Sequence, residues 1–459
     1  MSRSAPRVLP PPPPARPRGS GTARTPARRA VLAGAFGNFT EWYEFGVYGA
    51  FATVIADRFF APAGTDTAAL TGTYAAFALA FFFRPLGALL FGRIADREGR
   101  RPALLLTIAL MTAATTLIGL LPTHDTAGAA APWLLTALRA VQGLAAGGEF
   151  GGSVSLLTES APPGRRGRRG AWQSLTVALG LLAGTTTAVT LALLLGEQAL
   201  YAWGWRLPFL LALPLGLTAL RLRRDLPETA PPRTAPTTAP AADRTPSRAP
   251  TAAGPAVGTR GRGPRLAPTI ALGIARVMGW SAAGYTFLVV LPAHLQTTLG
   301  TGFGRAQAAG LLTTLGFAAA ILPAGILSDR TGRRAVTTTG CALVVLLAVP
   351  FLRLLRDPAA PHTGKAAALL LAGAVLGLLA GPGPALLAEM FPTEVRSTGL
   401  GLAYALSNAV FSGCAGLTVT LLTRWTGHPD VPALYAAACC ALSLPALLTL
   451  RPDDHLRPL

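Results

Sequence analysis

The chain has 459 residues, of which 51% are hydrophobic and only 13% are charged. This charged share is about half that of a typical soluble protein, which excludes an ordinary soluble domain. The net charge of +20 would suggest a nucleic-acid binder if the chain were soluble. The positions of the basic residues favour a membrane protein over a nucleic-acid binder, because 37 of the 40 lie at the ends of apolar runs or between them.

Twelve apolar runs follow one another along the chain. A helix of about 20 apolar residues crosses a hydrocarbon core of about 30 Å, and several of the runs reach that length. The sequence therefore predicts an all-α polytopic membrane protein with 12 transmembrane helices. The runs cover residues 31–58, 70–91, 103–121, 133–157, 171–195, 205–221, 267–293, 307–327, 335–352, 366–388, 399–422 and 432–450.

A segment rich in Pro, Thr, Ala and Arg separates the first six runs from the last six. This segment, 225–266, has no apolar run and is expected to be a disordered cytoplasmic linker. We expect one six-helix bundle over 31–224 and a second over 267–450. The Arg- and Pro-rich residues 1–30 are expected to form a disordered basic tail, and 451–459 a short C-terminal tail.

The basic residues predict the orientation in the membrane. Of the 40, 30 fall on the side of the two termini, 7 on the opposite side and 3 inside apolar runs. Loops on the cytoplasmic side carry the excess of Lys and Arg, so both termini are expected to be cytoplasmic. The partners expected from this topology are the lipid bilayer and a transported solute rather than nucleic acid. The four cysteines lie within apolar runs without zinc spacing and are expected to be small core residues.

One loop pattern occurs twice, at a spacing of 233 residues. Each copy follows the second helix of its half, so the chain is predicted to be a tandem duplication of a six-helix unit. The first glycine is expected to permit close helix approach, the aspartate to favour the positive end of the following helix dipole, and the arginines to pair with acids across the interface. Together the two copies are expected to form a cytoplasmic gate. They consist of Gly92, Asp96, Gly99, Arg100 and Arg101, and of Gly325, Asp329, Gly332, Arg333 and Arg334.

Acidic residues inside a membrane helix are costly and mark function by default. The first run carries Glu41, Glu44 and Tyr48, whose spacing places all three on one helix face. Two carboxylates so close together cannot easily both be ionised. One of them is therefore expected to hold a proton, as a proton-coupling site requires.

The fourth run carries Arg139, Gln142 and Glu149 on one stripe. An unpaired arginine at this depth is expensive, so Arg139 is expected to pair with a glutamate of the first run or with an anionic substrate. Glycines repeat every four residues in the same run and are expected to serve helix packing. Arg276, in the seventh run, is the next candidate for substrate or proton contact, with His294 and Asn408 after it.

The duplicated halves and the repeated G-x-x-x-D-x-x-G-R-R loop resemble the major facilitator superfamily. The resemblance implies two six-helix bundles with the substrate site between them near the middle of the bilayer. Further motifs are similar to those of the metabolite:proton symporter family, which most often has Asp where this chain has Glu44. They lie at Gly37 and Asn38, Glu41 to Gly46, Tyr48, Arg84 to Gly87, Gln142 to Gly152, Trp203 to Phe209, and Glu389 to Arg396.

That resemblance implies proton-coupled import of a small organic solute, either a proline- or betaine-type osmolyte or an organic carboxylate. A drug/proton antiporter is the alternative within transport, although the fifth run lacks the Gly-Pro signature of such exporters. A channel or a membrane solute sensor remains open. No phosphate-binding loop or nucleophile constellation is present, so the chain is not expected to be an enzyme. We expect a monomer in the cytoplasmic (inner) membrane, with the proton as coupling ion and no cofactor or metal.

Overall fold

The repeated loop marks equivalent turns in the two halves of the chain. The N-terminal copy joins α3 (Asp66–Glu98) to α4 (Arg100–Leu120), and the C-terminal copy joins α12 (Phe303–Thr331) to α13 (Arg333–Arg356). Gly99 and Gly332 adopt φ values of 103° and 87° at these turns, in the region that favours glycine. The duplication inferred from the sequence is thus visible in the backbone.

The computed structural model describes residues 24–60, 66–147, 149–159, 161–162, 164–224, 266–393, 395–451 and 456, while the side chains at 24–32, 66, 96, 100, 149 and 156 lie outside that description. The described part of the chain contains helices and no strands, as expected for an all-α protein. The linker was expected over 225–266; residues 225–265 lie outside the described residues, so it stays a prediction there, whereas Leu266 is the first residue of helix α10. Helix α1 begins at Arg24, inside the range expected to be a tail.

The N-terminal half forms one bundle of helices. Besides α3 and α4, it consists of α1 (Arg24–Ala50), α2 (Ala52–Ile55), η1 (Ala56–Phe60), α5 (His124–Ala127), α6 (Ala130–Ala146), α7 (Glu149–Glu159), α8 (Arg166–Ala199), η3 (Leu200–Gly204) and α9 (Arg206–Arg224), where η denotes a π-helical turn.

The C-terminal half forms the second bundle. Besides α12 and α13, it consists of α10 (Leu266–Tyr285), η4 (Thr286–Val290), α11 (Leu291–Leu299), α14 (His362–Ala380), α15 (Gly383–Ala388), α16 (Arg396–Ser407), η5 (Asn408–Gly413), α17 (Ala415–Thr426) and α18 (Val431–Leu448).

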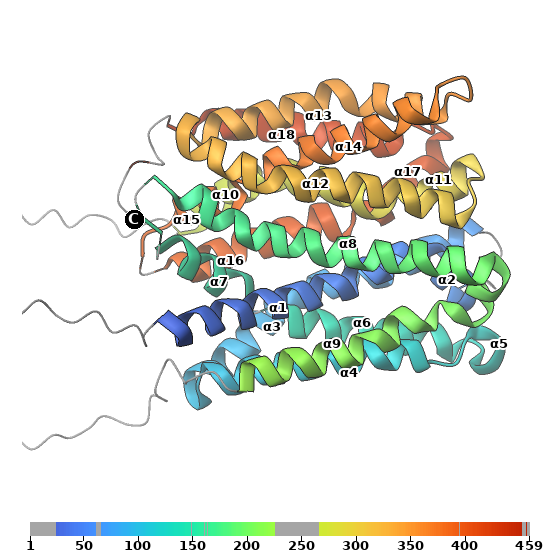
Figure 1. The fold of residues 1–459 in the computed structure, drawn as a ribbon, viewed down its shortest axis with the longest axis horizontal. Helices are drawn as coiled ribbons and strands as arrows, with labels where there is room; N and C mark the ends of the chain where they lie inside the picture. Colours follow the sequence, from blue (N-terminus) through green and yellow to red (C-terminus); the bar gives the residue numbers. More distant parts are fainter. Residues whose placement is uncertain are drawn as a thin grey trace, which may run out of the picture.

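The long helices lie alongside one another, and α8 of the first half packs beside α12 of the second (Figure 1). Helix α1 begins and α18 ends at the same end of the molecule, hereafter the termini end; the opposite end is the far end. Each of the twelve expected runs falls on a helical segment. Among the described residues, nine helices are long and apolar enough to cross a membrane.

The three remaining runs correspond to α1, to α6 with α7, and to α9. These segments are interrupted or more polar: α1 carries two glutamates, α9 has arginines at both ends, and the run 133–157 is divided between α6 and α7. Helix α6 ends at Ala146 with Gly147 as its C-cap, and glycine disfavours the helix interior.

Small residues bring the helices into close contact, as the glycine spacing predicts. A Cβ added at Gly143 would lie 2.0 Å from the Ala80 carbonyl oxygen, and one at Gly147 would lie 2.0 Å from the Arg84 carbonyl oxygen. These two glycines let α6 pack directly on the backbone of α3. The contact places the fourth-run polar residues against the interior of the bundle.

Candidate functional site

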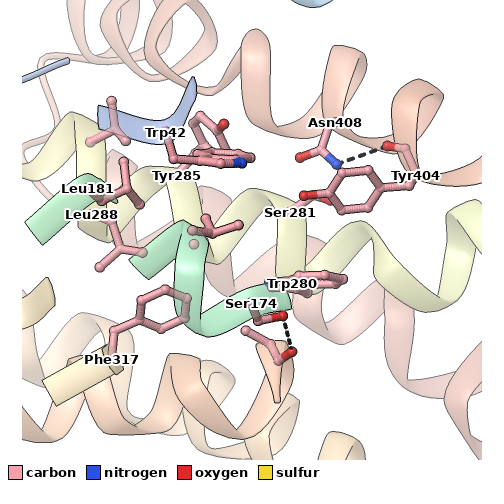
Figure 2. A pocket seen from close by; sticks show the side chains of 14 residues that line it. Trp42, Ser174, Leu181, Trp280, Ser281, Tyr285, Leu288, Phe317, Tyr404 and Asn408 are labelled. Atoms are coloured by element: carbon pink, nitrogen blue, oxygen red, sulfur yellow. Dashed lines mark hydrogen bonds between the residues drawn. The ribbon is translucent and has the colours of Figure 1, made fainter. Parts of the chain in front are cut away.

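A cavity of about 40 Å³ lies between the two halves (Figure 2). A water molecule needs about 10–15 Å³ measured in this way, so the cavity has room for about three. Its lining includes two serines and Asn408, the two tyrosines and two tryptophans, whose rings also carry O–H and N–H groups, and otherwise apolar residues. The lining residues are Trp42, Ser174, Val177 and Leu181 from the first half, and Trp280, Ser281, Gly284, Tyr285, Leu288, Val289, Phe317, Ala380, Tyr404 and Asn408 from the second.

Two pairs of aromatic rings form much of the cavity wall. The rings of Trp42 and Tyr285 lie 6.2 Å apart across the interface between the halves, and those of Trp280 and Tyr404 lie 5.6 Å apart. Asn408 is fixed between them, since its side-chain amide donates to the Tyr404 carbonyl oxygen at 2.9 Å. The π faces of aromatic rings attract cations, in particular quaternary ammonium groups.

Glu41 pairs with Arg84 directly behind this aromatic wall. The Glu41 Oε1 to Arg84 Nη2 distance is 3.5 Å, and both side chains are largely buried. The Arg84 guanidinium also lies over the rings of Phe81 and Phe45, at 4.3 and 4.6 Å. Arginine in a membrane helix needs an acidic partner, and Glu41 provides one.

Glu44 belongs to a separate chain of buried polar side chains. The Thr115 hydroxyl donates to Glu44 Oε2, and the Gln142 amide donates to Thr115 Oγ1 at 2.6 Å. Arg139 Nη1 in turn donates to Gln142 Oε1 at 2.7 Å. Glu44 and Arg139 are at most 1% exposed. The two charges are therefore connected through two neutral side chains rather than through a direct ion pair.

Tyr48 makes a cation–π contact with Arg139. The Arg139 guanidinium lies 4.1 Å from the centre of the Tyr48 ring, and the Tyr48 hydroxyl donates to the Thr73 carbonyl oxygen at 3.1 Å. Among the described residues, Nε and Nη2 of Arg139 donate no hydrogen bond. The rings of Phe45 and Phe77 lie 5.1 and 4.9 Å from the same guanidinium, so one amide and three rings orient the cation, and two of its nitrogens still have hydrogens to donate.

The structure brings together five of the seven residues expected to contact substrate or proton: Glu41, Glu44, Tyr48, Arg139 and Gln142. The expected partner of Arg139 needs correction, since Glu41 pairs with Arg84 and Glu44 reaches Arg139 only through Thr115 and Gln142.

The other two expected residues are not part of this cluster as described. Arg276 donates to the Ala446 carbonyl oxygen at 3.2 Å and to the Thr449 hydroxyl at 2.8 Å, at the end of α18. The side chain of Glu149 lies outside the described residues. Of the lesser candidates, Asn408 lines the cavity, whereas His294 Nε2 lies 3.1 Å from the Pro429 carbonyl oxygen. Sequence reasoning missed Thr115, which nothing distinguishes from the other threonines of its run.

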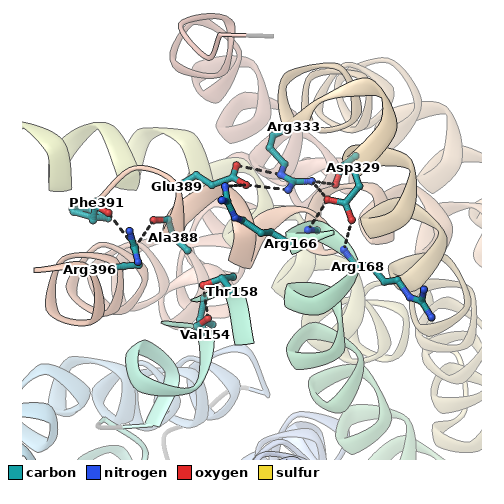
Figure 3. Close-up of polar contacts among 12 residues, drawn as sticks. Val154, Thr158, Arg166, Arg168, Asp329, Arg333, Ala388, Glu389, Phe391 and Arg396 are labelled. Atoms are coloured by element: carbon teal, nitrogen blue, oxygen red, sulfur yellow. Dashed lines mark hydrogen bonds and ion pairs between the residues drawn. The ribbon is translucent and has the colours of Figure 1, made fainter. Parts of the chain in front are cut away.

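At the termini end, Asp329 connects the two halves (Figure 3). Its two carboxylate oxygens accept hydrogen bonds from the backbone amides of Gly167 and Arg168, each at 2.8 Å, at the N-terminus of α8. Arg333 donates to Asp329 at 2.8 Å and to both oxygens of Glu389 at 3.0 and 3.2 Å. Glu389 also lies 3.8 Å from Arg166 of α8. We call the four charged side chains of Asp329, Arg333, Glu389 and Arg166 the α8–α12 ion-pair network.

A second contact between the halves lies beside this network. Arg396 donates to Glu159 Oε1 at 2.8 Å, joining α16 to the end of α7. The C-terminal repeat thus contributes contacts between the halves, and its gating role stays a prediction. Two details of the expected contacts need correction. The carboxylate of Asp329 binds the N-terminus of α8 rather than that of the helix that follows it. Arg333 pairs with acids of its own half, and the contacts across the interface come from Arg166, Arg396 and Asp329.

The N-terminal copy of the repeat behaves differently. A Cβ added at Gly92 would have no neighbour within 4 Å, so Gly92 does not serve close helix approach here, whereas one at Gly325 would lie 2.6 Å from Ala171 Cβ. Arg101 donates to the Arg224 carbonyl oxygen at the end of α9, within its own half. The side chains of Asp96 and Arg100 lie outside the described residues. The gating role of this copy, and of Arg334, stays a prediction.

The far end is also closed by contacts between the halves. The backbone amide of Phe303 donates to Glu197 Oε1 at 2.7 Å, and the Gln307 amide donates to the Ala50 carbonyl oxygen at 2.7 Å. Contacts between the halves are thus present at both ends of the molecule, in addition to those that line the small cavity. Two repeated bundles that enclose a central cavity, with buried charges beside it, define a secondary transporter.

Comparisons with known proteins place the chain in a family. Residues 30–231 match the family described as Sugar (and other) transporter, and residues 269–458 match the Major Facilitator Superfamily. An ectoine/proline transporter of Corynebacterium glutamicum is 35% identical, with 92% of this chain and 83% of the relative covered. An alpha-ketoglutarate permease of Escherichia coli is 34% identical, with 84% of this chain and 85% of the relative covered. A citrate-proton symporter of Salmonella typhi is 33% identical, with 94% of this chain and 96% of the relative covered.

The solved structure of a D-xylose-proton symporter has the same fold, with a TM-score of 0.73 at 18% identity over 95% of this chain and 100% of that one. The chain belongs to the major facilitator superfamily, in its metabolite:proton symporter family. It is a multi-pass transporter of the inner membrane that couples the import of small organic solutes to protons, as the sequence motifs predicted.

Proposed function

We propose that the solute is a zwitterion with one carboxylate and a substituted ammonium group, such as a betaine, proline or ectoine. The observation that carries this proposal is the aromatic wall of Trp42, Trp280, Tyr285 and Tyr404 around the cavity. Aromatic faces recognise quaternary ammonium groups through cation–π attraction, and they offer little to a di- or tricarboxylate. Among the relatives, the ectoine/proline transporter is named for solutes of this class.

The buried charges beside the cavity support the same choice. Arg84 and Arg139 carry two positive charges, and Glu41 and Glu44 carry two negative charges when both are ionised. Once Glu44 binds a proton, one positive charge is left over, and it can attract the carboxylate of a zwitterion while the aromatic wall binds the ammonium group of the same molecule. A substrate with two or three carboxylates leaves excess negative charge in a buried site, which is costly.

Glu44 is proposed as the group that binds the coupling proton, and Thr115 allows it to do so. When Glu44 is ionised, the Thr115 hydroxyl donates to it and accepts from Gln142. When Glu44 is protonated, its own O–H donates to Thr115, whose hydrogen turns to the Met111 carbonyl oxygen 3.0 Å away. The hydroxyl remains paired in both states, and Gln142 connects it to Arg139 in each of them.

The proposal includes the setting in which the protein works. The termini end faces the cytoplasm, a placement supported by the 30-to-7 division of the basic residues. The functional unit is proposed to be a monomer, in which both halves of one chain line the cavity. Transport needs no cofactor other than the proton and involves no catalysis. Nucleic acid is not a partner, because the basic residues follow the membrane topology.

Equilibrium binding to the purified full-length protein tests the substrate class. Two tryptophans line the cavity, so we expect glycine betaine, proline or ectoine to change the intrinsic fluorescence saturably, and citrate and α-ketoglutarate to leave it unchanged. Trp280→Leu is expected to weaken zwitterion binding by about tenfold or more, because a desolvated cation–π contact contributes about 2 kcal/mol. Trp425→Leu is the matched control, since Trp425 is 78% exposed. Tighter binding of citrate than of any zwitterion would overturn the proposal.

A further inference from the structure

A second hollow, larger than the central cavity, lies in the C-terminal half between α13 and α14. It has a volume of about 210 Å³, and every residue that lines it is apolar. We call it the α13–α14 groove. Its lining residues are Phe287, Leu343, Val344, Leu347, Ala348, Pro350, Phe351, Leu354, Ala368, Leu371, Ala372, Val375 and Leu376.

The groove opens on the outer surface of the bundle. Leu347 and Leu371 line it and are 40% and 58% exposed, and Leu346 beside it is 68% exposed. Its floor is closed by Phe287, whose ring packs edge-on against Phe351 at 5.6 Å. In a membrane protein, such an opening faces lipid rather than water, so the groove is open to acyl chains.

The length of the groove matches the depth of one lipid leaflet. On α13 its lining runs from Leu343 to Leu354, about 16 Å along the helix at 1.5 Å per residue. Half of a hydrocarbon core of about 30 Å is about 15 Å. The groove ends where α13 ends, next to the loop to α14 at the far end, which is the level of the lipid head groups.

Basic residues gather at that head-group level. Arg353 and Arg356 lie in the last turn of α13, and Lys365 lies in the first part of α14. They are three of the seven basic residues expected on this side of the membrane, where Lys and Arg are scarce. Asp430 pairs with both arginines, and the Asp357 carboxylate accepts from the Ala359 amide at 2.9 Å. Three cations against two carboxylates leave a net positive charge.

The helix dipole explains the two arginines but not the lysine. A cation is favourable in the last turn of a helix and unfavourable near the first turn, where Lys365 lies. Lys365 is also the only lysine among the 40 basic residues. It shares one helix stripe with Ala368, Ala372 and Val375 of the groove lining, at spacings of 3, 7 and 10 residues.

We propose that the α13–α14 groove binds one acyl chain of an anionic phospholipid, whose phosphate is bound by Lys365 and by Arg353, which has a side chain that is 65% exposed. The apolar walls recognise the chain, and the surplus charge at the mouth selects an anionic over a zwitterionic head group. This site is separate from the transport cavity and does not depend on which solute is carried.

Native mass spectrometry of the delipidated full-length protein tests the proposal. The protein is titrated with phosphatidylglycerol or with phosphatidylcholine of the same chains. We expect phosphatidylglycerol to bind more tightly, and Lys365→Ala to weaken it about fivefold, because one basic residue contributes about that factor near a membrane surface. Phosphatidylcholine should be weakened less, because its choline cation offsets the charge of its phosphate. Arg424→Ala is the matched control, being exposed at the same side but outside the groove.

A second variant separates the acyl chain from the head group. Ala368→Phe fills the head-group end of the groove and is expected to weaken both lipids by about tenfold, the equivalent of two methylene groups no longer buried. Thermal unfolding in detergent confirms that each variant is folded. Equal binding of both lipids by the wild type, or undiminished binding by folded Ala368→Phe, would overturn the proposal. Inorganic phosphate competing as well as the lipid would also overturn it, since the acyl chain would then be irrelevant.

Discussion

Asp329→Asn is expected to open the termini end of the transporter. The Asp329 carboxylate accepts two backbone amides of α8 and the Arg333 guanidinium, all at 2.8 Å. Asparagine replaces one oxygen by an NH2 group, so one α8 amide loses its acceptor and the ion pair with Arg333 loses its charge. A hydrogen bond to a charged group contributes about 1.5–3 kcal/mol. A loss of about 2 kcal/mol corresponds to a roughly 30-fold larger open population.

The assay measures access to Ser174, a cavity residue of α8 that is 2% exposed and donates to the Ala380 carbonyl oxygen across the interface. Ser174→Cys is introduced with and without Asp329→Asn, and the rate of alkylation by a maleimide is measured. Protein without the Ser174→Cys change reports the background of the four native cysteines.

The alkylation rate is expected to rise roughly 30-fold, because labelling requires opening. Asp357→Asn, an exposed loop carboxylate at the far end, is the matched control and should leave the rate unchanged. A rate within threefold of the parent would show that Asp329 does not hold the termini end closed.

Two further substitutions test the interior of the N-terminal half. Thr115→Val keeps the side-chain shape but removes the hydroxyl shared by Glu44 and Gln142, so proton-driven uptake should fall at least tenfold and its pH profile should change. Thr115→Ser retains the hydroxyl and should restore both the uptake and the pH profile. Wild-type uptake by the valine variant would exclude a role for this hydroxyl in proton coupling. Gly143→Ala places a Cβ 2.0 Å from a carbonyl oxygen of α3 and should destabilise the fold by about 1–3 kcal/mol in thermal unfolding. Gly152→Ala is the matched control and should not destabilise the fold, because a Cβ added there has no neighbour within 4 Å. Equal destabilisation by the two substitutions would contradict the packing described.

The topology was accessible from sequence because hydrophobicity, chain length and the duplicated loop are local properties. The twelve runs and the helix face shared by Glu41 and Glu44 depend only on spacing along one helix. The packing of Gly143 could be inferred in the same way, since it follows from a four-residue repeat in a membrane helix.

The partners of the charged residues could not be predicted, because they depend on how separate helices pack. Arg139 was expected to reach a glutamate directly, but Thr115, contributed by α4, lies between them. The two copies of the repeated loop are alike in sequence, yet Gly325 packs against α8 and Gly92 has open space. This difference reflects the helices that surround each copy.

The central claim is that Glu44 carries the coupling proton, and uptake into proteoliposomes tests it most directly. Glycine betaine uptake is measured under an inward proton gradient of one pH unit, which supports up to about tenfold accumulation if one proton enters per solute. We predict that the wild type accumulates the solute above equilibrium and that Glu44→Gln equilibrates it without accumulation. Accumulation by Glu44→Gln to the wild-type level would contradict the account.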